Sequence, residues 1–195
     1  MLSFAVAVFL LLITPGPGVL STAGVGAGFG YRPGLRYLIG LFIGTNLVAA
    51  AVISGLAAIV LSVEPLRVVL LYASIAYLGY LAVRIALAGT RIGFMEARSA
   101  PGARDGVILQ LINPKAYVVN TTLFSGFPVA ALGLGGETAL KLVVINAVWI
   151  PIHLLWLAAG VQVKRLALPP RAQFAINLAM AAAMLGVVGL AAVGG

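Results

Sequence analysis

The stretch YLIGLFIGTNLVAAAVISGLAAIVLSV, residues 37–63, contains no charged residue. An α-helix needs roughly 20 apolar residues to cross the ~30 Å hydrocarbon core of a bilayer, so this stretch is long enough to span it. Other stretches without Lys, Arg, Asp or Glu have comparable length: 1–31, 142–163 and 172–195. All are continuously apolar and do not alternate in polarity, which favours membrane-spanning helices over a β-barrel.

The composition agrees with a lipid environment. Of 195 residues, 63% are hydrophobic and 8% are charged, whereas a soluble domain carries about 25% charged residues. The chain has no cysteine, which excludes disulfides, thiol catalysis and Cys-based metal sites. We expect no metal and no cofactor. The net charge of +8 is better explained by orientation in a membrane than by nucleic-acid binding, because the basic residues lie in short loops.

Shorter apolar runs at 68–83 and around Lys115 complete the pattern. We therefore predict an all-α, polytopic membrane helix bundle that forms a single domain, 1–195. Its six expected spans are 2–25, 36–61, 67–88, 106–130, 140–163 and 172–193. The first apolar run has no basic residue before it, so we interpret it as a retained span and not as a signal peptide.

The basic residues predict the orientation. Most of them fall in the first, third and fifth loops: Arg32, Arg36, Arg91, Arg98, Arg104, Lys164, Arg165 and Arg171. The second and fourth loops each hold a single basic residue, Arg67 and Lys141, close to a glutamate. By the positive-inside rule the odd-numbered loops face the cytoplasm, and both termini face outward. A re-entrant fourth segment would instead flip one end of this topology.

The chain also reads as a doubled three-helix unit. The polar loop 89–105 separates a first repeat, about 1–88, from a second, about 106–195. Each half opens with an apolar segment interrupted by proline, and Asn46 and Asn146 follow these prolines at nearly the same distance. An odd number of spans per half makes the repeats inverted. Matching broken segments in two halves are the best sequence indication of a transporter binding site.

The two interruptions share a pattern. Thr14-Pro15 and Asn113-Pro114 each place an N-capping side chain before a proline suited to the first helical position. Each predicts a new helix start, whose N–H groups and dipole attract a carboxylate. Gly16 and Gly18, on either side of Pro17, would let a ligand approach the backbone. The alternatives are a simple kink at the first site and, at the second, a span that begins there while Lys115 snorkels to the headgroups.

Polar side chains inside the apolar runs are further candidates. Asn46 and Asn146 are expected either to line a cavity or to form an interhelical hydrogen bond. The single histidine, His153, is either a proton-relay group or a buried hydrogen-bonding residue. All four carboxylates are assigned to loops, so proton coupling would fall to His153, Lys115 or Asp105.

The string Ile13-Thr14-Pro15-Gly16-Pro17-Gly18-Val19-Leu20 resembles the N-terminal signature of the lysine exporter family, which includes homoserine and threonine efflux proteins. Asn113-Pro114-Lys115-Ala116-Tyr117 is similar to its second signature. The resemblance covers nearly the whole chain and implies efflux of amino acids or related metabolites, by proton antiport, through inverted three-helix repeats. Two features depart from the family pattern: Gly18, where relatives often carry Asp or Asn, and the polar run Asn120-Thr121-Thr122, where relatives are usually more apolar.

We therefore expect a secondary transporter, not an enzyme, that exports amino-acid-like solutes across a bacterial inner membrane by alternating access. The solute carboxylate would meet the segments Pro15–Gly18 and Pro114–Lys115. Asn46, Asn146 and Tyr117 remain alternatives for reading its ammonium group. An intramembrane enzyme and a non-transporting assembly subunit are the competing classes. A homodimer is the expected assembly, and no nucleic-acid partner is expected.

Overall fold

The computed structural model describes residues 2–86, 99–128 and 133–166, and beyond these the positions 169, 171–172, 174–176, 178–179 and 182. The described chain is helical and contains no strand. Its named helices are α1 (Leu2–Ile13), α2 (Pro17–Phe29), α3 (Tyr31–Ile53), α4 (Leu56–Ser62), α5 (Glu64–Ala86), α6 (Ala103–Ile112), α7 (Pro114–Ser125) and α8 (Leu134–Arg165). The predicted all-α class is confirmed.

Several of these helices can cross a membrane. Within the described residues, α3, α5 and α8 are long and apolar enough to span, and α1 with α2 passes the same test as a single span bent by 50°. The polytopic membrane architecture predicted from the charge-free stretches is therefore confirmed. The count of six stays a prediction, because most of the sixth expected span, 172–193, lies outside the described residues, as do Arg91, Glu96 and Arg98.

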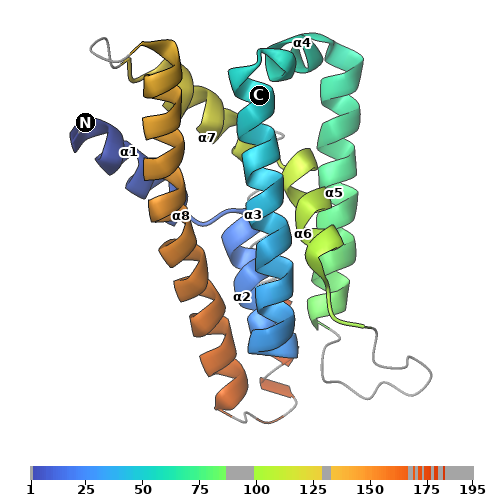
Figure 1. The fold of residues 1–195 in the computed structure, drawn as a ribbon. Coiled ribbons are helices and arrows are strands. Elements are labelled where there is room, and N and C mark those ends of the chain that lie inside the picture. Colours follow the sequence, from blue (N-terminus) through green and yellow to red (C-terminus); the bar gives the residue numbers. More distant parts are fainter. Residues whose placement is uncertain are drawn as a thin grey trace.

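The second expected span, 36–61, is wrong at both ends. It starts earlier, at Tyr31, and ends at Ile53, where the chain turns through Ser54 and Gly55. Gly55 has φ 76°, a left-handed conformation that glycine adopts at little cost and that commonly ends helices. The rest of the apolar run forms the short helix α4, which lies across the end of the bundle between α3 and α5 (Figure 1).

Two interrupted helix pairs run in opposite directions through the bundle. In Figure 1, α1 and α2 descend from the upper left, whereas α6 and α7 rise from the lower right. Each pair is followed by a long helix that runs back in the other direction: α3 rises after α1 and α2, and α8 descends after α6 and α7. These directions are those that inverted halves would have.

Helix α2 forms the centre of the bundle. Every residue from Pro17 to Ala27 is buried, and α2 packs closely against α3 and α8. Small residues allow this approach: a Cβ on Gly160 of α8 would overlap the carbonyl oxygen of Ala23. The same device joins α3 to α6, where a Cβ on Gly40 would overlap the carbonyl oxygen of Ala103. Close backbone contact through small residues is the usual basis of helix association in membranes.

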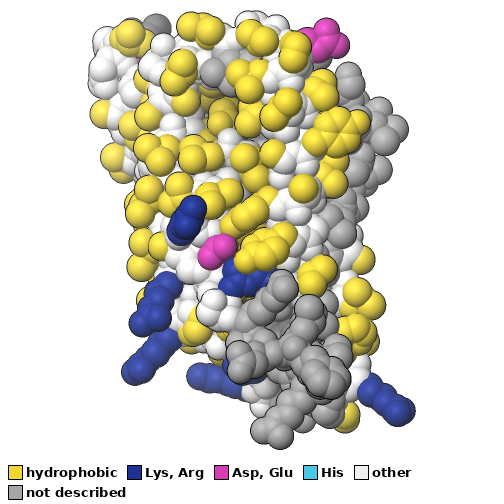
Figure 2. Space-filling model, turned by 90° about the vertical axis from the view of Figure 1, so that its right-hand side faces the viewer, with side chains coloured by type: hydrophobic (Ala, Val, Ile, Leu, Met, Phe, Trp, Pro, Cys, Tyr) yellow, Lys and Arg dark blue, Asp and Glu magenta, His cyan; other side chains and the backbone are white. Residues whose placement is uncertain are grey.

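Charge is distributed unevenly along the bundle. Figure 2 shows the dark blue Lys and Arg side chains gathered in the lower part of one face, beneath a surface that is mostly hydrophobic. The first residues of α3 and α6 and the last residues of α5 and α8 supply basic side chains to this end: Arg32, Arg36, Arg84, Arg104, Lys164 and Arg165. We call this the basic end. These basic residues gather at one end of the bundle, as the sequence predicts, but those that the sequence assigned to loops lie in helices.

Gly40→Ala tests the close contact between α3 and α6. The added methyl group meets backbone atoms of Ala103 that cannot move aside, and overpacking of this kind costs about 1–3 kcal/mol. We expect a lower midpoint of thermal unfolding in detergent, monitored by size-exclusion chromatography after heating. Gly79→Ala is the matched control, because among the described residues no side chain and no atom of another helix lies within 4 Å of its added Cβ. Equal midpoints for the two variants would contradict the contact.

Candidate functional site

The two helix breaks meet at one cavity. Lys115, in the first turn of α7, extends to the break between α1 and α2, where its Nζ donates a hydrogen bond of 2.5 Å to the carbonyl oxygen of Thr14. The stem of the same lysine fills the space beside Gly16. The cavity between these segments has a volume of about 50 Å³. The sequence-based expectation that the two breaks lie together is confirmed in position.

The first break differs from its prediction. The new helix begins at Pro17, with Gly16 as the N-cap, and not at Pro15 with Thr14 as the cap. Thr14 instead ends α1, and its hydroxyl donates to the carbonyl oxygen of Leu10 at 2.6 Å. Because Gly16 has no side chain to cap with, the N–H groups of Gly18 and Val19 have no partner among the described residues. Both residues line the cavity.

The second break follows its prediction. Asn113 is the N-cap of α7, Pro114 occupies the first helical position, and the Asn113 side chain accepts a hydrogen bond of 3.1 Å from the backbone N–H of Lys115. Asn113 is also held from the preceding helix, because its Nδ2 donates to Oε1 of Gln110 at 2.8 Å. The start of α7 is thus capped by the protein, whereas the start of α2 is open.

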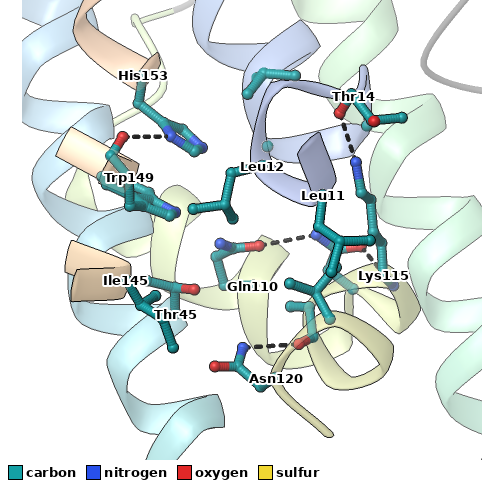
Figure 3. Close-up of a pocket in the computed structure, with 16 residues that line it drawn as sticks. Leu11, Leu12, Thr14, Thr45, Gln110, Lys115, Asn120, Ile145, Trp149 and His153 are labelled. Carbon is teal, nitrogen blue, oxygen red and sulfur yellow. Dashed lines mark hydrogen bonds between the residues drawn. The ribbon is translucent and has the colours of Figure 1, made fainter. Parts of the chain in front are cut away.

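His153 and Gln110 complete the wall opposite Lys115 (Figure 3). The Nδ1 atom of His153 lies 2.9 Å from the carbonyl oxygen of Trp149, and the two rings are stacked with centroids 3.6 Å apart. A Cβ built on Gly18 would lie 3.6 Å from Nε2 of His153 and 3.9 Å from Oε1 of Gln110. The absence of a side chain at Gly18 therefore brings both polar groups next to the open start of α2.

Six of the predicted substrate-binding residues do not line this cavity: the prolines at the breaks, Pro15, Pro17 and Pro114, and three polar residues, Asn46, Asn146 and Tyr117. Asn46 of α3 and Asn146 of α8 form a reciprocal pair of hydrogen bonds, of 3.1 Å and 3.0 Å between their side-chain amides. Tyr117 donates from its hydroxyl to the carbonyl oxygen of Leu111 at 2.8 Å. For the two asparagines the structure shows the interhelical hydrogen bond, which was the alternative to a cavity role.

Asp105 also lies apart from the other proton-coupling candidates. At the basic end of the bundle, its Oδ1 lies 3.4 Å from Nη1 of Arg84 and accepts a hydrogen bond of 3.0 Å from the hydroxyl of Tyr77. Its assignment to a loop is wrong, because it lies in the first turn of α6. Glu137 was placed in a loop as well, yet it lies in the first turn of α8.

Sequence reasoning missed Gln110 and Thr45, and it noted Asn120 only as a departure from a family pattern. Each of the three lines the cavity. Gln110 gave a usable signal: it is a polar residue within the apolar run 107–112, one helical turn before the N-cap Asn113. Thr45 had no comparable signal, since threonine occurs widely in membrane helices.

The sequence profile of the LysE type translocator matches residues 9–194, nearly the full chain. The chain belongs to the LysE type translocator family. As a translocator of this family it is a multi-pass membrane protein that exports amino acids or related compounds, and it belongs with transporters, not enzymes. No curated protein and no solved structure matches this LysE type chain.

A double-mutant cycle on Asn46 and Asn146 separates their structural role from a binding role. Each single change to Ala leaves one half-buried amide without its interhelical partner, and interhelical hydrogen bonds of this kind contribute about 0.6–2 kcal/mol. We expect each single variant to lower the free energy of unfolding, and the double variant to lower it by less than the sum of the two. Additive effects on unfolding, together with lost transport in both single variants, would assign the pair to substrate binding.

Proposed function

We propose that this LysE type protein exports amino acids across a bacterial inner membrane by alternating access, and that it binds the solute carboxylate between the start of α2 and Lys115. One observation carries the proposal. The open N–H groups of Gly18 and Val19 and the ammonium group of Lys115 line the same cavity. Unpaired N–H groups at a helix start, with the helix dipole behind them, form an anion site, and Lys115 adds a full positive charge.

The remaining cavity groups suit the other end of an amino acid. Thr45 and Asn120 line the side of the cavity away from His153 and Thr14 (Figure 3). Asn120 is anchored by its Nδ2, which donates to the carbonyl oxygen of Ala116 at 2.8 Å, so its Oδ1 remains available to an ammonium group. These two residues replace Asn46, Asn146 and Tyr117 as our candidates for reading the ammonium.

The small size of the cavity supports a conformational change during transport, as in alternating access. A volume of about 50 Å³ holds only a few water molecules, since each needs roughly 10–15 Å³ on this measure. An amino acid is larger, so the helices around the cavity must separate to admit it. We propose that the two halves, about 1–88 and 106–195, are inverted repeats that rock against each other. The reciprocal pair of Asn46 and Asn146 joins equivalent helices of these halves.

The charge distribution supports an orientation. With the basic end in the cytoplasm, the start of α1 lies on the external side, as the sequence predicts. The predicted external C-terminus lies outside the described residues. The predicted homodimer stays a prediction.

Proton coupling is the finer part of the proposal. His153 and Lys115 are the titratable side chains that line the cavity among the described residues, and histidine is the side chain that changes charge near neutral pH. We propose that His153 carries the coupled proton, because its Nε2 faces the start of α2 where the solute carboxylate would bind.

Counterflow in proteoliposomes tests the binding site. Vesicles are preloaded with one unlabelled L-amino acid, and uptake of the same amino acid in labelled form is measured. The assay is repeated for each of the twenty common amino acids. We expect Lys115→Met to reduce the initial rate at least about tenfold for the amino acids that wild type moves, because one charge-assisted contact contributes roughly 1.5–3 kcal/mol. Lys164→Met is the matched control: this exposed lysine also donates to a backbone carbonyl, that of Gly28 at 3.4 Å. Equal rates in both variants would remove Lys115 from the site.

An imposed pH gradient tests the role of His153. We expect His153→Gln to retain counterflow, which needs no net proton movement, and to lose the acceleration of transport that the gradient gives wild type. The glutamine keeps a polar side chain of similar reach against Trp149. A His153→Gln variant that is still driven by the gradient would exclude this residue as the proton carrier.

A further inference from the structure

A second cavity lies at the end of the bundle opposite the basic end. Its volume is about 390 Å³, several times that of the cavity at the helix breaks. The end of α3, the start of α4, the last turns of α7 and the first turns of α8 line it. Its walls combine apolar side chains such as Val52 and Ile53 with the hydroxyl groups of Thr121 and Thr138. It is large enough for an amino acid.

An ion pair is built into this cavity. Nζ of Lys141 lies 2.6 Å from Oε1 of Glu137, one turn earlier on α8, and the side chains are 1% and 19% exposed. Lys141 also donates to the carbonyl oxygen of Phe124 at 2.9 Å. Its ammonium lies 5.9 Å and 6.0 Å from the ring centroids of Phe4 and Phe124. The cation is therefore held in place from three helices, α1, α7 and α8.

Stability alone does not explain this pair. Removing two charges from water costs more than their attraction commonly returns, so a well-packed apolar pair at the same positions is often as stable or more stable. The pair lies on α8, a helix long and apolar enough to span a membrane, and charged side chains within such helices usually mark the path of a solute. The pair lies where a solute leaving the first cavity away from the basic end would pass.

We propose that this outer cavity is a second binding site for zwitterionic amino acids, in which Lys141 binds the carboxylate and Glu137 binds the ammonium group. The proposal rests on the function proposed above, because it adds a second station for the same solutes. A zwitterion can insert into the pair and leave no charge without a partner. A solute without a carboxylate would separate Glu137 from Lys141 and leave the lysine side chain, which is 1% exposed, without its carboxylate partner, which is strongly unfavourable.

The two sites are adjacent along the same helices. Val119 and Asn120 of α7 and Ile145 of α8 line the inner cavity, and Thr121, Phe124 and Lys141 line the outer one. Ile145 follows Lys141 by one turn, about 6 Å along the helix axis. An apolar cluster of Phe4, Val8, Val119, Leu123 and Ile145 packs α1, α7 and α8 together at this level. Rearrangement of this cluster would connect the inner site with the outer one.

Equilibrium binding of radiolabelled L-amino acids to the full chain in lipid nanodiscs tests the second site. The principal variant is Glu137→Gln with Lys141→Met, which removes both charges together and so leaves no unpaired buried charge to unfold the protein. Lys115→Met removes the inner site. We expect wild type to bind two equivalents of an accepted amino acid and each of these variants to bind one. Lys141→Arg, which keeps the cation, should retain two.

Analogues of the accepted amino acid test how the pair reads its ligand. In Lys115→Met, where only the outer site remains, we expect the α-amide and the des-amino acid each to bind at least about 100-fold more weakly than the amino acid, because the α-amide offers no carboxylate to Lys141 and the des-amino acid offers no ammonium group to Glu137. Equal binding of either analogue would overturn the zwitterion assignment.

The stoichiometries separate the two proposals. One equivalent in wild type that is lost in Lys115→Met and kept in the double variant would overturn the outer site and leave the inner one standing. One equivalent in wild type that is kept in Lys115→Met and lost in the double variant would support the outer site and overturn the inner one. No binding of any amino acid to wild type would overturn both.

Discussion

Inside a bilayer, a backbone N–H or C=O group without a partner costs several kcal/mol, and this chain interrupts two of its helices at that depth. The structure brings the interruptions together so that one satisfies the other. The carbonyl group of Thr14, freed where α1 ends, accepts from the ammonium of Lys115 at the start of α7. Asn113 caps α7 itself. The first N–H groups of α2 stay open among the described residues, so unpaired donors gather beside the cavity.

This point fixes the packing around it. Because α2 starts within the bundle and is 13 residues long, the helices around it must enclose it on all sides, and its residues from Pro17 to Ala27 are buried. Small residues make that possible, as at the contact of Ala23 with Gly160. The same closeness sets His153 against Gly18. The polar wall of the cavity is thus a consequence of how the break is buried.

Much of this arrangement could be read from the sequence, and the failures have physical causes. The charge-free stretches predicted the long helices correctly, because the hydrocarbon core disfavours charged side chains and backbone groups that are not hydrogen-bonded within a helix. Asn113-Pro114 gave a correct helix start because only one proline lies within reach of the cap. The first break holds Pro15 and Pro17, and both fit a first helical position. The structure uses the second, since the hydroxyl of Thr14 bonds back to Leu10 within α1.

Side-chain partners were harder to predict than helices. An amide in an apolar run must find a partner, but the run does not say whether that partner is a solute or another helix. Asn46 and Asn146 find each other. Glu137 and Lys141 were assigned to a loop because charges usually end a span, whereas here each shields the other and α8 continues through both. Pairing across helices, which depends on three-dimensional packing, decided both cases.

The shared use of Lys115 suggests how an exporter of this kind avoids leaking. Its ammonium joins the two breaks through a hydrogen bond to the carbonyl oxygen of Thr14. A solute carboxylate in the cavity would compete for that ammonium and, at the start of α2, would supply the acceptor that the open N–H groups lack. In the proposed cycle the contact that holds the halves closed is therefore exchanged for a contact with the solute. A ligand shifts a conformational equilibrium only through its different affinity for the two states, and this exchange is a source of that difference.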